Sequence, residues 1–156
     1  MTGSEPQLFH PGDLDYIHSV ERISKFSNVI SINGGVQLDL MGQENAESTG
    51  TRQLSGVGGQ MDFLEGAYRS KGGKGFICIN SSRVTKDGER KSNILATIPG
   101  GSTISAPRTM IQYVATEYGI ASLSGKTLRE RAEAMASIAH PDFREELMKY
   151  AQENFK

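Results

Sequence analysis

The fold is decided by a stretch near the N-terminus, residues 29–40, which reads VISINGGVQLDL. Its first four residues are mainly apolar. Val36 to Leu40 then alternate apolar and polar side chains, the period of a half-buried strand. Asn33, Gly34 and Gly35 lie between the two runs and tolerate positive φ angles. The stretch therefore predicts two strands joined as a hairpin.

Outward from this stretch, further apolar runs predict strands, and two segments with helical spacing predict short helices. We expect the strands at Phe76–Ile79, Ile94–Ile98 and Tyr113–Thr116, and the helices at Tyr16–Lys25 and Met61–Ala67. Residues 1–15 are polar and contain prolines, so they are interpreted as an arm that precedes a single domain, residues 16–156.

Two helices are predicted at the C-terminus. Thr127 and Glu130 have the spacing of a capping box, and Pro141 suits the first turn of a second helix. Each helix has an apolar stripe: Leu128, Ala132, Met135 and Ala139 in the first, Phe143, Leu147, Tyr150 and Ala151 in the second. Strands first and helices last predict an α/β fold, an open mixed or parallel sheet with flanking helices. An all-helical structure or a closed antiparallel barrel would contradict this prediction.

Composition excludes several kinds of partner. The formal net charge is -1, which gives no electrostatic reason to expect nucleic acid or an anionic membrane. No apolar run approaches the roughly 20 residues that span a bilayer. The three histidines lack metal-site spacing, so we expect no metal site.

The single cysteine, Cys78, rules out an internal disulfide framework and favours a reducing compartment, so we expect a cytoplasmic protein. Because Cys78 lies in the apolar run Phe76–Ile79, its thiol is expected to be buried and inert.

The most informative segment for function is a glycine loop, residues 55–60. It consists of Ser55, Gly56, Val57, Gly58, Gly59 and Gln60. Glycines leave backbone N–H groups open to a phosphate or to the oxyanion of an acyl-transfer intermediate. A tight turn would need the same residues, and the spacing alone does not separate the two interpretations. Met61 stands where a dinucleotide-binding motif requires its third glycine, which disfavours a Rossmann cofactor site.

Two charged residues are further candidates. Lys86 carries a charge that suits a phosphate group, although a solvated surface lysine is the commoner case. Glu117 lies among apolar neighbours, where its carboxylate can be structural, paired with an arginine, or catalytic. The sequence does not decide between these roles.

Five motifs occur in order along the chain and together carry a family resemblance. They are QLDLMGQ (37–43), SGVGGQMDF (55–63), SKGG (70–73), TEYG (116–119) and AHPDFR (139–144). This set resembles the C-terminal region of the acetyl-CoA hydrolase/transferase family, and within it the 4-hydroxybutyrate and butyryl-CoA:acetate CoA-transferases. The resemblance runs from about Tyr16 to Leu147.

The resemblance implies ping-pong transfer of coenzyme A (CoA) between an acyl-CoA and a short-chain carboxylic acid of the acetate, butyrate or 4-hydroxybutyrate type. A glutamate attacks the thioester and becomes a glutamyl-CoA thioester. In the family this glutamate stands upstream of the matched region, and Met1 to Asp15 hold no counterpart. The family's first CoA-binding domain is also missing. We therefore expect that domain as a partner, together with a homo-oligomeric assembly, and CoA as a substrate with no permanent cofactor.

The resemblance also assigns site residues. The glycine loop is the place where relatives contact CoA and the reacting acyl group, with Ser55 among the CoA contacts. Lys86 matches a CoA-contacting lysine when a small insertion is allowed. His18 and Asn93 stand where relatives often carry Asn and Arg. Two alternatives stay open: an acyl-CoA hydrolase, and a catalytically silent CoA-binding or subunit-assembly module.

Overall fold

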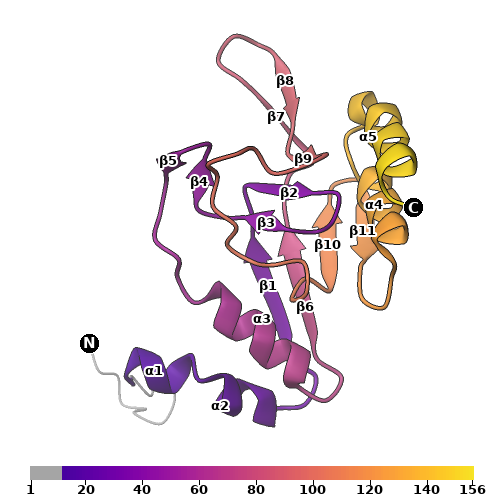
Figure 1. Ribbon diagram of the computed structural model, residues 1–156. Helices are drawn as coiled ribbons and strands as arrows, with labels where there is room; N and C mark the ends of the chain where they lie inside the picture. The colour runs from indigo at the N-terminus through magenta and orange to yellow at the C-terminus, as the bar shows by residue number, and fades with distance from the viewer. Residues whose placement is uncertain (1–11) are drawn as a thin grey trace.

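A computed structural model describes residues 12–156 and shows an α/β fold, which confirms the predicted fold class (Figure 1). The helices are α1 (Leu14–Ile17), α2 (Val20–Lys25), α3 (Gln60–Arg69), α4 (Leu128–Ser137) and α5 (Pro141–Asn154). The strands are β1 (Ile30–Gly34), β2 (Gln37–Asp39), β3 (Glu44–Asn45), β4 (Ser48–Thr49), β5 (Arg52–Gln53), β6 (Lys74–Cys78), β7 (Ser82–Val84), β8 (Arg90–Ser92), β9 (Ile94–Leu95), β10 (Tyr113–Thr116) and β11 (Gly119–Ser122). Helix α1 starts inside the segment interpreted as an arm; the rest of that segment, up to Pro11, lies outside the described residues.

The main sheet has the strand order β1-β6-β10-β11. Strands β1, β6 and β10 run parallel, and β10 and β11 form an antiparallel hairpin. This mixed, open sheet agrees with the sequence prediction. Parallel neighbours need long crossovers, and the crossover between β1 and β6 carries strands β2 to β5, the glycine loop and α3.

The predicted hairpin at residues 29–40 is wrong. Strand β1 pairs with β6, whereas β2 belongs to a separate sheet with the order β3-β2-β9. The Gly35 N–H donates to the Cys78 carbonyl (3.3 Å), which extends the β1–β6 ladder before the chain leaves for the second sheet. The alternation of apolar and polar residues identifies strands but not their partners. Here the partner of β1 lies more than 40 residues later in the chain.

Helix α3 covers one face of the main sheet (Figure 1). A Cβ on Gly75 would lie 2.9 Å from Leu64 Cδ2, so the face that includes Gly75 and Ile77 is the one that meets α3. That face continues through Val114 and Ala121, and all are buried. Together with α4 and the second sheet it forms one hydrophobic core.

The opposite face of the main sheet is open and apolar in the described structure. Ile30, Ile32 and Ile120 are 52%, 69% and 63% exposed there. Phe76 and Tyr113 stack in register between them with ring centroids 4.9 Å apart. We call these five side chains the open face. Parallel sheets are normally covered on both sides, so this face has the composition of an interior surface.

Cys78 belongs to the same side of the sheet, and its predicted burial is wrong, because the residue is exposed. In β6 the side chains alternate between the faces, so only Gly75 and Ile77 are buried. The apolar neighbours of Cys78 indicated a strand correctly. They did not indicate which face of it is covered.

The C-terminal helices confirm their sequence signals. Thr127 accepts from the Glu130 backbone N–H and Glu130 reaches back to Thr127, a complete capping box. Pro141 stands in the first turn of α5. Of the predicted stripes, Leu128 is 39% exposed, while Ala132, Met135 and Leu147 are buried. Among the described residues, no helix is long and apolar enough to cross a membrane.

Candidate functional site

The glycine loop connects β5 to α3 and lies on an open surface. Residues 55–58 are exposed, and Gly59 and Gln60 are partly buried where α3 begins. Two backbone hydrogen bonds hold the start of the loop, since the Leu54 and Ser55 N–H groups both donate to the Glu47 carbonyl, at 2.7 and 3.4 Å. The Ser55 carbonyl also accepts from Gln53 Nε2 (2.8 Å). Gly58 has a φ of +64°, a backbone conformation that residues with a side chain rarely adopt.

The loop presents a row of free donors. Within the described part of the chain, the backbone N–H groups of residues 56–62 have no acceptor, and the first intrahelical bond is from Phe63 to Gly59 (3.3 Å). These N–H groups lie at the positive end of the α3 dipole. Such an arrangement suits a phosphate or a developing oxyanion.

His18 explains why residue 59 is a glycine. A Cβ on Gly59 would lie 2.2 Å from His18 Cε1 and 2.3 Å from its Nδ1, so only a residue without a side chain fits beneath the imidazole. The ring also stands edge-on to Phe63, with centroids 5.1 Å apart, and its Nδ1 is 3.6 Å from Asp62 Oδ2. His18 thus packs on the first turn of α3.

Glu44 is a buried carboxyl that the sequence analysis missed. Its side chain is 0% exposed, and Oε2 accepts a hydrogen bond from Gln60 Nε2, while Oε1 has no partner among the described residues. Burial raises the pKa of Glu44 to about 8, although the Gln60 hydrogen bond acts in the opposite direction. The sequence offered one signal: Glu44 directly follows the QLDLMGQ motif (37–43), part of which forms the buried strand β2.

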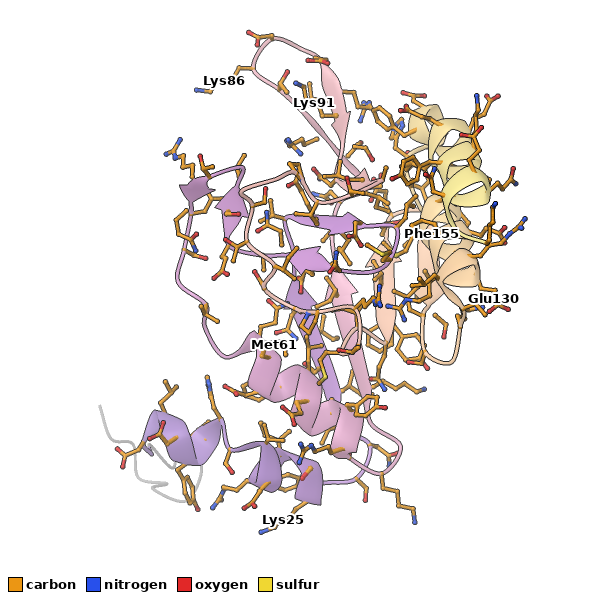
Figure 2. The ribbon with its side chains drawn as sticks, in the orientation of Figure 1. Lys25, Met61, Lys86, Lys91, Glu130 and Phe155 are labelled. Atoms are coloured by element: carbon orange, nitrogen blue, oxygen red, sulfur yellow. The ribbon has the colours of Figure 1, made fainter. Side chains whose placement is uncertain are left out.

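The structure does not bring Lys86 to the glycine loop. Lys86 is exposed in the turn of the β7–β8 hairpin, which projects away from the sheets. Figure 2 shows it well separated from Met61, the residue that follows Gln60. The CoA role of Lys86 therefore stays a prediction without geometric support from this loop.

Glu117 has a structural hydrogen-bond role in the turn between β10 and β11. Its Oε1 accepts from Ser81 Oγ (2.6 Å) and its Oε2 from the Ser81 N–H (2.9 Å). Burial acts to raise the pKa of Glu117, but the two Ser81 bonds, a hydrogen bond with the backbone of Glu117 itself and the charge of His140 together hold that pKa below its ordinary value. Of the roles left open by the sequence, the structural one fits these contacts.

Two pockets of similar volume are among those on the described surface. One, of about 440 Å³, lies at the carboxyl ends of the parallel strands and is lined by Gly35, Cys78, Ile79, Asn80, Ala115 and Thr116. The other, of about 430 Å³, lies beside the start of α4 and includes Arg108, Lys126 and Arg131. Neither is lined by a residue of the glycine loop.

Comparison with known proteins identifies the class of protein. The family defined as the acetyl-CoA hydrolase/transferase C-terminal domain matches residues 5–151, and the chain belongs to this family of enzymes. It is 47% identical over 139 residues to the butyryl-CoA:acetate CoA-transferase of Anaerostipes caccae, covering 89% of this chain and 31% of the relative. It is 48% identical over 142 residues to the 4-hydroxybutyrate coenzyme A transferase of Clostridium kluyveri, covering 91% and 32%.

A solved structure supports the same assignment. The crystal structure of 4-hydroxybutyrate CoA-transferase from Porphyromonas gingivalis matches with a TM-score of 0.71 and 40% identity, over 90% of this chain and 30% of that one. The fold described above is therefore that of a CoA-transferase C-terminal domain. The chain spans about a third of the length of the relatives it matches.

Proposed function

We propose that this chain is the C-terminal portion of a CoA-transferase, which moves CoA between an acyl-CoA and a short-chain carboxylic acid of the acetate, butyrate or 4-hydroxybutyrate type. The reaction passes through a glutamyl-CoA thioester whose glutamate lies in the upstream part of the enzyme. The glycine loop contributes the contacts to CoA and to the reacting acyl group.

One observation carries this proposal: the row of free N–H groups at residues 56–62, at the start of α3 in a chain of this family. These donors suit both charges that the reaction presents, the phosphates of CoA and the oxyanion that forms when the thioester is attacked. Because the donors are backbone groups, their position is fixed by the fold before the substrate arrives.

The open face supports the further proposal that the upstream part of the enzyme packs on this domain. Ile32 and Ile120 are about two-thirds exposed, on a sheet whose parallel strands normally have both sides covered. The relatives are about three times as long as this chain, so they have the material for a second layer. We propose that their upstream portion provides it.

Two alternatives predict different behaviour. An acyl-CoA hydrolase would use the same loop, with water in place of the acceptor acid. A silent CoA-binding or subunit-assembly module would keep the loop or the open face without turnover. Adding acetate to the assembled enzyme distinguishes the transferase from the hydrolase, because only a transferase forms acetyl-CoA from butyryl-CoA and acetate.

Titration of the chain with CoA, followed by amide NMR, tests the loop contact. We expect the largest shift changes at residues 56–62, with weaker binding in a Gly56→Ala variant. A Cβ at Gly56 meets no atom within 4 Å, so this substitution obstructs a ligand without disturbing the fold. Shift changes confined to the α4 pocket around Arg108 and Lys126 would contradict the assignment of the loop.

A further inference from the structure

Gln60 connects the glycine loop to the interior of the protein. It is the first residue of α3 and follows Gly58 and Gly59 directly. Its side-chain amide donates to Glu44 Oε2, a contact that spans 16 residues of sequence. The loop has few other attachments at this end, because its N–H groups have no acceptor among the described residues.

The backbone of Glu44 is fixed by hydrogen bonds and strand pairing. Its N–H donates to the Ala106 carbonyl (3.0 Å), its carbonyl accepts from Ser105 (2.8 Å) and Ala106 (3.3 Å), and it pairs with Leu38 across β3 and β2. The backbone that carries the carboxyl is therefore fixed by neighbours on both sides. A hydrogen bond from Gln60 to this carboxyl ties the loop to a rigid element.

The Gly35 turn and two isoleucines lie near the other oxygen of the carboxyl. A Cβ on Gly35 would lie 2.7 Å from Glu44 Oε1, and the same point is 3.0 Å from Ile79 Cγ2 and 3.2 Å from Ile77 Cγ2. The Gln60 amide thus bonds the carboxyl directly, while the Gly35 turn and the methyl groups of Ile77 and Ile79 lie close by. Burial and the Gln60 bond are the two causes of the Glu44 pKa shift, and no charged group is among them.

We propose that Glu44 is the positioning residue of the glycine loop: by holding Gln60 it fixes Gly58 and Gly59 in the conformation that presents their N–H groups to the CoA thioester. The inference rests on the proposed function for its ligand, while the anchoring itself is a property of this chain. Glu44 acts through Gln60 and does not touch the substrate.

The anchoring has a direct chemical consequence. An ionised carboxylate with a single hydrogen bond is costly in an apolar interior. Loss of the Glu44 proton therefore favours conformations in which water reaches the carboxyl, and those require Gln60 or the Gly35 turn to move. The loop is expected to loosen as the pH rises through the pKa of Glu44.

Limited proteolysis of the chain measures loop opening. The readout is the rate of proteinase K cleavage between Ser55 and Met61, divided by the rate for a free peptide of residues 52–62 at the same pH. This ratio follows the population of the open loop. We expect Glu44→Leu, which removes the acceptor, to raise the ratio about tenfold below pH 7, the size expected for loss of one buried hydrogen bond. Its ratio should not change with pH, so the difference from wild type narrows as Glu44 of the wild type ionises.

Two further variants separate positioning from general stability. Glu44→Gln keeps an acceptor but cannot ionise, so its ratio should stay near the wild-type value at low pH and lack the wild-type rise near pH 8. Asp39→Asn is the matched control. Asp39 is also 0% exposed and accepts from a glutamine, Gln43 Nε2 (2.7 Å), but it is the last residue of β2 and does not bond Gln60. It should leave loop cleavage within about twofold of wild type, the scatter expected for a site that shares no partner with Gln60.

Either of two results overturns the inference: a Glu44→Leu protein whose loop is cleaved at the wild-type rate, or a Glu44→Gln protein that keeps the full pH dependence. If Glu44→Leu does not fold, the Glu44→Gln comparison decides alone. CoA titration of the same samples tests the proposed function independently of the cleavage ratios. A wild-type chain that binds no CoA counts against the proposed function, whereas the cleavage ratios still decide the role of Glu44.

Discussion

At the scale of the residue, the contact between His18 and Gly59 makes a specific prediction. Gly59→Ala places a methyl group within 2.3 Å of the imidazole, so the ring must move. We expect a loss of roughly 1–3 kcal/mol in the free energy of unfolding, as for other overpacked sites. In a His18→Ala background the penalty should shrink, because the obstruction is gone. Urea unfolding of the four proteins in the cycle measures this coupling.

Gly56→Ala is the control for the loop, because it has no steric neighbour within 4 Å and should change stability by less than about 0.5 kcal/mol. An unchanged Gly59→Ala penalty in the His18→Ala background would contradict the packing explanation. The comparison also matters for function. A loss of activity in Gly59→Ala would mix substrate obstruction with the displacement of His18, whereas Gly56→Ala avoids that ambiguity.

Glu44 predicts a dependence of stability on pH. Its pKa is about 8 in the folded chain against an ordinary value of 4.5, so between these values the unfolded state releases a proton that the folded state keeps. The Glu44 contribution to the free energy of unfolding is thus greatest below about pH 4.5. It falls by up to about 1.4 kcal/mol per pH unit as the pH rises toward 8, then levels off.

Urea unfolding of wild type and Glu44→Gln across this pH range isolates the contribution, because the other titrating groups are common to both. The difference between the two curves should slope in favour of the variant as the pH rises. Parallel curves between pH 5 and pH 8 would mean that Glu44 ionises normally.

At the scale of the element, Arg131 fixes α4 to three separate segments. It is 8% exposed and donates to the carbonyls of Met41, Leu123 and Arg108, each at 2.8 Å. Arg131→Met leaves these acceptors without a donor, at an expected cost of roughly 3 kcal/mol or more. Arg131→Lys should recover only part of it, because an ammonium group cannot reproduce the guanidinium fork.

Arg129→Met is the matched control in the same helix. Arg129 is exposed and pairs with Glu133 (2.9 Å), so its loss should cost no more than about 0.5 kcal/mol. Thermal or urea unfolding of the three variants gives the comparison. Equal losses for Arg131→Met and Arg129→Met would show that the three carbonyl contacts do not stabilise the fold.

The elements also show which parts of the structure the sequence could predict. The capping box at Thr127 and the start of α5 at Pro141 depend on neighbours a few residues away, and both were predicted correctly. The partner of β1 depends on β6, more than 40 residues later, and the hairpin prediction failed there. Similarly, the glycine loop was visible in the sequence, but its anchor at Glu44 depends on a contact made by the fold.

At the scale of the whole molecule, the open face predicts an interface with the upstream portion of the enzyme. Ile32→Asp should abolish co-purification with the part of the Anaerostipes caccae relative that precedes its C-terminal domain. The isolated variant should stay as stable as wild type to within about 0.5 kcal/mol, because Ile32 is 69% exposed. Ile104→Asp, which alters an exposed isoleucine outside the main sheet, should leave co-purification intact. If both variants co-purify equally well, the interface lies elsewhere.

The most direct test of the account is an assay of CoA transfer from butyryl-CoA to acetate, with this chain alone and with the same upstream portion of the Anaerostipes caccae relative. We predict no transfer by the chain alone, because the proposed function places the nucleophilic glutamate in the upstream portion, and formation of acetyl-CoA once the two parts are combined. Transfer by the chain alone that is lost on mutation of one of its own glutamates would contradict the account.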